Sequence, residues 1–202
     1  MYPFARMAHQ MARARLLPPM GILDVHVSRH LCLPWDLDGF GELNNGRVLT
    51  LYDLGRFALG VRVGLMRVLR RRRWGLAVAG ASVRYRRRIT PFQCFEMRTR
   101  LAGWDGRFFY IVQSMWVGGQ CCSQALLRTA VVARGRAVPT AEVAGALGHE
   151  GGSPPMAAWI EAWIEAEARR PWPPEGLDAT GVADGRAAED GAPIPTPPEE
   201  GR

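Results

Sequence analysis

The sequence contains no lysine. All 26 of its basic residues are therefore arginine, against 19 acidic residues, which gives a formal net charge of +7. Acidic residues are frequent after Pro171, so the chain before that point is more basic than the total suggests. Because guanidinium groups bind phosphates well, this balance favours an anionic partner such as a nucleotide phosphate and leaves a nucleic acid as a further alternative.

Cysteine and histidine are scarce, and their spacing excludes the common metal sites. The four cysteines lack the paired spacing of zinc sites, and His149 has no second histidine at the spacing of a zinc protease. Adjacent Cys121 and Cys122 are too constrained for an ordinary structural disulfide, which favours a reduced, cytoplasmic protein. Ser82 lacks the downstream glycine of a nucleophile elbow, and no phosphate-binding loop or dinucleotide motif is present. We therefore expect no metal and no cofactor.

Long apolar runs are also missing. Arg6, Arg13 and Arg15 interrupt the first twenty residues, so neither a secretory signal nor a membrane span is expected. Residues 4–17 are compatible with a short basic amphipathic helix. This helix either touches a membrane surface or docks loosely on the rest of the chain.

The composition fits one globular domain with additional segments at both ends. With 202 residues, 48% hydrophobic and 22% charged, the chain can bury a sizeable core. We expect an N-terminal extension at residues 1–20, a domain at 21–138, a linker and C-terminal helix at 139–170, and a disordered acidic tail at 171–202. The C-terminal helix is predicted from the apolar stripe between Met156 and Ile164, and its amphipathic pattern predicts that it docks.

Hydrophobic periodicity predicts an α+β fold. Alternation predicts a first strand, helical spacing predicts a long helix, and four more alternating segments joined by short turns predict an antiparallel meander. The expected strands are residues 22–30, 76–89, 95–101, 107–117 and 121–134, and the expected helix is 46–69.

Three glycines in the predicted helix need an explanation. Gly55, Gly60 and Gly64 each weaken a helix by roughly 1 kcal/mol. A close approach of the helix to a curved sheet would require such a residue, and a break between Gly60 and Gly64 before a second short helix is the other explanation.

The stretch from Leu33 to Arg47 carries the strongest chemical signal. It holds Asp36, Asp38 and Glu42, a glycine-rich turn and an Asn-Asn pair directly before the long helix. An asparagine is a natural helix cap, so the acids are expected in a loop that feeds a helix N-terminus. Such an end offers free backbone N–H groups and partial positive charge, which together with a carboxylate are what acyl transfer needs.

The same stretch resembles the hotdog-fold acyl-CoA thioesterase superfamily, whose pattern reads roughly D-x-D-x-x-x-H-x-N-N-x-x-Y. Residues 53–56, 83–86 and 101–105 extend the resemblance, which covers about residues 22–135 and is similar to the thioesterase-superfamily-member subgroup. The resemblance implies an antiparallel sheet wrapped around one long helix, and a homodimer or tetramer with active sites shared between subunits. It also implies that Asp38 is the catalytic carboxylate and that the N–H groups near Asn45 and Gly46 bind the thioester oxygen.

Two departures from the pattern leave two functions open. Glu42 stands where the family has His, and Val48 where it has Tyr. Loss of the family's His and Tyr favours a non-hydrolytic protein that binds acyl chains or acts as an interaction subunit. Retention of both aspartates and both asparagines favours an acyl-CoA thioesterase, with coenzyme A present only as part of the substrate.

Each candidate carboxylate also has a structural alternative. Asp36 and Asp38 are equally typical of turn caps before glycine. Glu42 is either a second acid or base, or a solvated loop residue. Asp53 rivals Asp38 because some hotdog enzymes use a helix carboxylate, but its spacing to Arg56 favours an ion pair.

Residues expected to bind the substrate come from the loop, the helix and one strand. Aromatic residues would form acyl-pocket walls. Arginines, including the run 70–73, would either hold coenzyme A phosphates or form a solvated face. These candidates are Asp36, Asn44, Tyr52, Phe57, Tyr85, Arg84 and Arg86. With an acyl thioester as the expected partner, no nucleic acid is expected.

Overall fold

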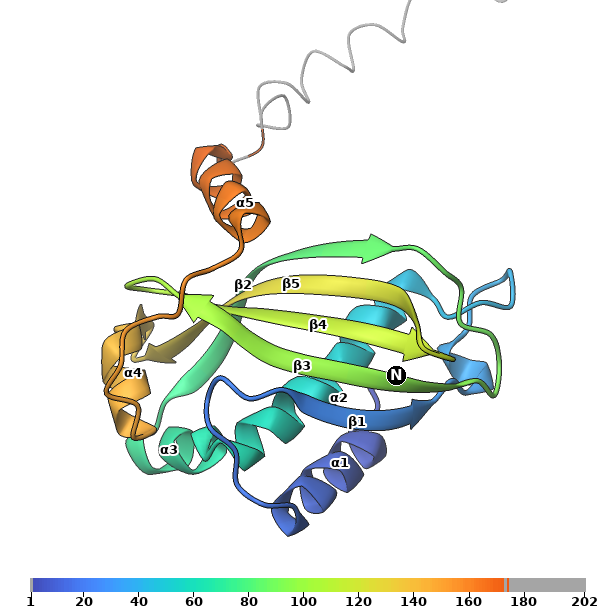
Figure 1. Ribbon diagram of the computed structural model, residues 1–202, viewed down its shortest axis with the longest axis horizontal. Helices are drawn as coiled ribbons and strands as arrows, with labels where there is room; N and C mark the ends of the chain where they lie inside the picture. Colours follow the sequence, from blue (N-terminus) through green and yellow to red (C-terminus); the bar gives the residue numbers. More distant parts are fainter. Residues whose placement is uncertain (1, 173, 175–202) are drawn as a thin grey trace, which may run out of the picture. The chain divides into compact units, whose positions relative to one another are not determined.

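The computed structural model describes residues 2–172 and 174 (Figure 1). Its internal contacts divide the chain into Met1–Met156 and Ala157–Arg202, and each part is described by itself. The expected disordered tail at 171–202 lies almost entirely outside the described residues.

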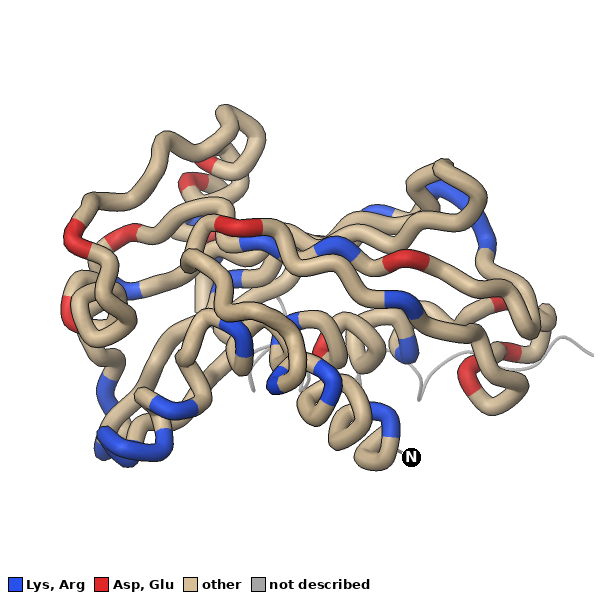
Figure 2. The backbone as a smooth tube through the Cα atoms, turned by 60° about the horizontal axis from the view of Figure 1, so that its bottom comes forward, with Lys and Arg blue, Asp and Glu red and all other residues tan. Residues whose placement is uncertain are grey.

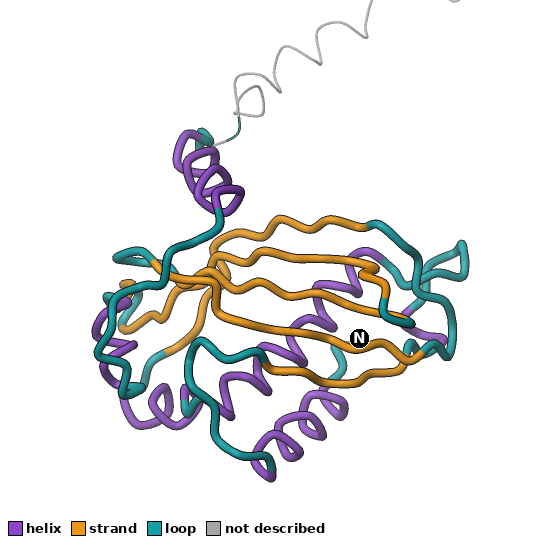
Figure 3. The backbone as a smooth tube through the Cα atoms, in the orientation of Figure 1, coloured by secondary structure: helices purple, strands orange, loops and turns teal. Residues whose placement is uncertain are grey.

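The first part is built on one antiparallel sheet, shown in orange in Figure 3. Its strand order is β1-β3-β4-β5-β2, with the short β6 paired to β5. The strands are β1 His26–Leu31, β2 Gly75–Tyr85, β3 Cys94–Trp104, β4 Phe109–Val117, β5 Gln120–Ala133 and β6 Arg136–Ala137. Only part of the predicted meander is confirmed: β3, β4 and β5 pair in chain order, whereas β2 pairs with β5 and not with β3. In addition, β1 begins four residues later than alternation suggested, and β2 ends at Tyr85.

The sheet curls around α2, Asn45–Arg62 (Figure 1). This arrangement confirms the expected α+β class and hotdog fold. Gly55 allows the close approach, because a Cβ atom there would lie only 2.5 Å from Oγ1 of Thr99 and 2.6 Å from Sδ of Met97. The expected break between Gly60 and Gly64 is also present. Gly64, with a φ of 81°, separates α2 from the short helix α3, Leu65–Arg72.

The core forms two clusters of buried side chains. One lies around the first half of α2 and includes Leu51, Tyr52 and Phe95. The other lies around α3 and α4, Thr140–Ala146, and includes Leu69 and Val143. The α4 helix corrects the expectation of a linker directly after residue 138, because its Val143 and Ala144 are buried in this second cluster.

The N-terminal segment folds as α1, Phe4–Leu16, which lies alongside α2 (Figure 1). Met7, Gln10 and Ala14 are buried on its inner face. Its contacts are specific, because Arg6 bonds to Asp36. The docked alternative for this segment is therefore the one that the structure shows.

In the second part, the predicted C-terminal helix is α5, Ala158–Arg169. Ile160 is its buried residue. Its docking on the rest of the chain stays a prediction.

Candidate functional site

The loop between β1 and α2 is held by Asp36, which is 1% exposed. Oδ2 accepts hydrogen bonds from Arg6 at 2.6 Å and from the Leu33 N–H at 3.1 Å, and Oδ1 accepts one from Arg47 at 2.7 Å. Burial by itself would raise the pKa of Asp36, but the bonds from Arg47 and Arg6 outweigh it and lower the pKa. Asp36 therefore joins α1 to the start of α2 and leaves no oxygen free for a substrate.

Asp38 shapes the turn that follows. Its Oδ1 accepts hydrogen bonds from the N–H groups of Phe40, at 2.9 Å, and Glu42, at 3.3 Å. This is the turn-capping arrangement that aspartate favours before glycine. Within the described residues, Oδ2 has no hydrogen-bond partner, so one carboxylate oxygen of Asp38 stays available.

The N-terminus of α2 has the predicted cap. Asn44 Oδ1 accepts the Arg47 N–H at 3.0 Å. The N–H groups of Asn45 and Gly46 have no acceptor among the hydrogen bonds of the described residues. Two unoccupied donors at the positive end of an 18-residue helix are suited to a carbonyl oxygen that gains negative charge.

A cavity of about 210 Å³, here called the N-terminal cavity, lies beside this helix end. Tyr85, at the end of β2, pairs with Ser123 of β5, and its hydroxyl contacts the Asn45 carbonyl at the start of α2. The walls come from the loop, α2, the segment after β2 and β5. They are formed by Glu42, Leu43, Asn45, Val48, Tyr85, Arg86, Arg87, Arg88, Ile89 and Ser123.

Charge in the N-terminal cavity is mostly positive. Glu42 pairs with Arg88 at 3.2 Å, and both side chains are substantially exposed, so the pair contributes little stability. Tyr85 donates a hydrogen bond to the Asn45 carbonyl at 3.1 Å, and burial raises its pKa. Arg86 and Arg87 leave the cavity attractive to phosphates.

Several predicted site residues do not line this cavity. Tyr52 is buried behind it, with its hydroxyl 2.8 Å from Oγ of Ser123, and burial raises its pKa strongly. Arg84 is exposed and is absent from the cavity walls, as is Asp38. Phe57 lines a different cavity.

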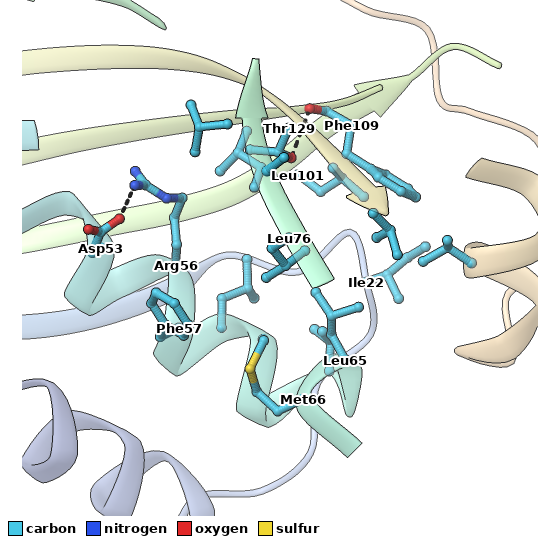
Figure 4. Close-up of a pocket in the computed structure, with 18 of the residues that line it drawn as sticks. Ile22, Asp53, Arg56, Phe57, Leu65, Met66, Leu76, Leu101, Phe109 and Thr129 are labelled. Carbon is cyan, nitrogen blue, oxygen red and sulfur yellow. Dashed lines mark hydrogen bonds and ion pairs between the residues drawn. The ribbon is translucent and has the colours of Figure 1, made fainter. Parts of the chain in front are cut away.

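That second cavity, here called the apolar cavity, has a volume of about 350 Å³ and lies between α2, α3 and the sheet (Figure 4). Phe57, Leu65 and Leu101 point into it. Its walls are almost entirely apolar, and its polar residues are Asp53, Arg56, Tyr2 and Thr129.

Asp53 and Arg56 form the ion pair that their spacing predicted. Tyr2 of the N-terminal segment donates a hydrogen bond to Asp53 at 3.0 Å, and Arg56 donates one to Gln113 Oε1 at 2.6 Å. Burial lowers the pKa of Arg56, and the neighbouring Asp53 opposes this shift. Asp53 is therefore fully engaged, which favours its structural interpretation.

Comparison with known proteins identifies the family. The model of the thioesterase-like superfamily matches residues 32–175. The chain belongs to the thioesterase-like superfamily. Curated relatives include Protein THEM6 from Xenopus laevis, which is 37% identical over 111 residues, covering 54% of each chain. The chain spans about half the length of the curated relatives it matches.

Solved structures of similar fold include hotdog thioesterases of the superfamily. YbaW, a probable thioesterase from Escherichia coli, superposes with a TM-score of 0.57 at 17% identity, covering 60% of this chain and 95% of that one. A 1,4-dihydroxy-2-naphthoyl-CoA thioesterase from Synechocystis gives 0.54 at 11% identity, covering 61% and 95%. At these identities the likeness shows the fold alone.

Sequence reasoning missed several residues that line the two cavities. Arg87 and Ser123 line the N-terminal cavity, and Tyr2 lines the apolar cavity. Arg87 belongs to the arginine run that directly follows β2 and is visible in the sequence, whereas no local pattern marks Tyr2 or Ser123. Among the described residues, no group of three or more His, Cys, Asp or Glu side chains is placed to hold a metal ion, and no helix is long and apolar enough to cross a membrane.

Proposed function

We propose that this protein hydrolyses acyl thioesters, with acyl-CoA as the first class to test, at the N-terminal cavity. One observation carries the proposal: the unoccupied N–H groups of Asn45 and Gly46 lie at the end of a long helix beside a cavity rimmed by arginine. The N–H groups would bind the thioester oxygen as its charge develops. Arg86 and Arg87 would attract the phosphates of coenzyme A.

Hydrolysis also needs a carboxylate that activates water or attacks the carbonyl. The loop offers two. The family pattern assigns this role to Asp38, which keeps one oxygen unbonded, whereas Glu42 is the carboxylate that lines the cavity. Asp36 is not a third candidate, because both its oxygens bond to arginine.

We further propose that two copies complete the site by pairing along β2. In the described part of the chain, β2 pairs only with β5, and its Val78 is 57% exposed. An unpaired strand edge is a ready surface for a second copy. Antiparallel pairing about the middle of β2 would bring the apolar cavity, lined by Leu76 and Val78, toward the partner's Tyr85 end, so the acyl chain and the thioester would be bound by different subunits.

The test measures free-thiol release from a panel of acyl-CoA substrates by Asp38→Asn, Glu42→Gln and the wild type. The catalytic carboxylate is the one whose substitution lowers turnover by about 10² or more without a loss of thermal stability. Glu96→Gln is the matched control, because it removes a partly exposed carboxylate paired with Arg98 on β3, outside both cavities. Full activity in both loop variants would refute the proposed site.

The second candidate function is binding of acyl-CoA without hydrolysis. Two observations favour it. Glu42, at the position where the family usually has a histidine, is paired with Arg88, and Val48, at the position where the family usually has a tyrosine, is buried. Wild-type protein that binds acyl-CoA but releases no thiol above background would select this function.

A further inference from the structure

The surface of α3 carries an unusual concentration of positive charge. Arg67 and the run from Arg70 to Arg73 are all exposed. In the part of the chain that the structure describes, none of these arginines forms an ion pair with a carboxylate. Because like charges this close repel one another, an external anion would stabilise the segment.

The C-terminal end of α1 extends this charge. Two hydrogen bonds join the segment after α1 to the end of α2, shortly before α3: Arg62 donates to the Pro18 carbonyl at 3.0 Å, and the Met20 N–H donates to the Arg62 carbonyl at 3.2 Å. Arg13 and Arg15 lie in the last turn of α1 and are exposed. Figure 2 shows the basic positions of α1 and α3 in blue along the same side.

Exposed leucines lie among these arginines. Leu16 and Leu17 follow Arg15 directly and are 86% and 44% exposed. Leucine gains nothing from contact with phosphate groups, but it is stabilised when it enters the boundary between lipid headgroups and acyl chains. The mixture therefore distinguishes a lipid surface from a nucleic acid, for which arginine alone would suffice.

We propose that the α1–α3 surface, defined as residues 13–17 together with residues 67–73, binds the surface of an anionic lipid membrane. The arginines pair with lipid phosphates and carboxylates, and the two leucines insert below the headgroups. The apolar cavity lies next to this surface, because Ile22, Val63 and Met66 line it. The proposal concerns a partner and stands whether or not the protein hydrolyses thioesters.

The test is co-sedimentation of the full chain with vesicles. The wild type should bind vesicles of phosphatidylcholine mixed with phosphatidylserine much better than pure phosphatidylcholine, and added salt should weaken the binding. Arginine near an anionic bilayer contributes about fivefold each, so the triple variant Arg70→Gln/Arg71→Gln/Arg72→Gln should lower the partition coefficient about 100-fold. The variant Leu16→Ser/Leu17→Ser should lower it as well, with its arginines intact.

A charge-matched control keeps the test specific. Arg29→Gln/Arg100→Gln/Arg136→Gln removes three exposed arginines from strands of the sheet. An equal loss of binding in this control would show that only net charge acts and would overturn the proposal. Equal binding of the wild type to mixed-sequence duplex DNA, together with unchanged vesicle binding by the leucine variant, would assign the surface to nucleic acid instead. Thermal melting confirms that every variant is folded before it is compared.

Discussion

Replacing Asp36 with Asn tests whether this carboxylate holds the N-terminal helix to the candidate site. Asp36 is 1% exposed and pairs with Arg6 and Arg47, whose side chains are 20% and 14% exposed. Loss of one partner from a buried ion pair costs about 3–5 kcal/mol, and the partial exposure of both arginines places the expected loss near about 3 kcal/mol. For a chain of this size, that loss lowers the Tm by about 6–12 °C.

The free energy of unfolding is measured by urea titration followed by tryptophan fluorescence, with a thermal melt beside it. Glu96→Gln breaks only the partly exposed pair with Arg98 and should cost less than about 1 kcal/mol. Arg6→Gln should cost less in the Asp36→Asn background than in the wild type, because the two substitutions remove the same contact. A loss below about 1 kcal/mol for Asp36→Asn would refute the reasoning.

Three further outcomes are expected. Burial lowers the pKa of His26 to about 4 and that of His30 to about 3, whereas in the unfolded chain both histidines take up protons near pH 6.5. Urea titrations should therefore show the free energy of unfolding falling as the pH drops from about 6.5 to about 4, because the unfolded state binds more protons in this range. Gly55→Ala should destabilise the fold by about 1–3 kcal/mol, although alanine favours helices, because its Cβ would lie 2.5 Å from Oγ1 of Thr99; a stabilised variant would contradict the close approach. Val78→Lys should shift sedimentation velocity toward monomer, and a wild type that is monomeric at micromolar concentration would refute pairing along β2.

The sequence predicted the fold because each element carries its own periodicity. Alternation along β3 and β4 and helical spacing along α2 are local properties, and the chain order then leaves few arrangements. The break at Gly64 was also visible locally. The start of β1 was misjudged because residues 22–25 alternate like a strand although they pair with no neighbour.

The candidate site was predictable only where its contacts are local. The Asn44 cap and the Asp53–Arg56 pair lie within three residues along the chain, so their spacing shows them. The bond from Tyr2 to Asp53 joins residues 51 apart, and the Glu42–Arg88 pair joins residues 46 apart. Such contacts depend on how the helices pack, and the volume of the apolar cavity depends on the same packing.

The position of α1 limits how many residues can be removed from the N-terminus of this chain without loss of contacts to the domain. A chain trimmed to the hotdog boundaries, beginning near residue 21, would lack Arg6 and Tyr2. Asp36 would then keep one guanidinium partner in place of two, and Asp53 would lose the hydrogen bond from Tyr2. Met7 would no longer cover the core. Tyr2 and the first helix are therefore structural parts of the folded domain, and their removal would expose core that the sheet alone does not cover.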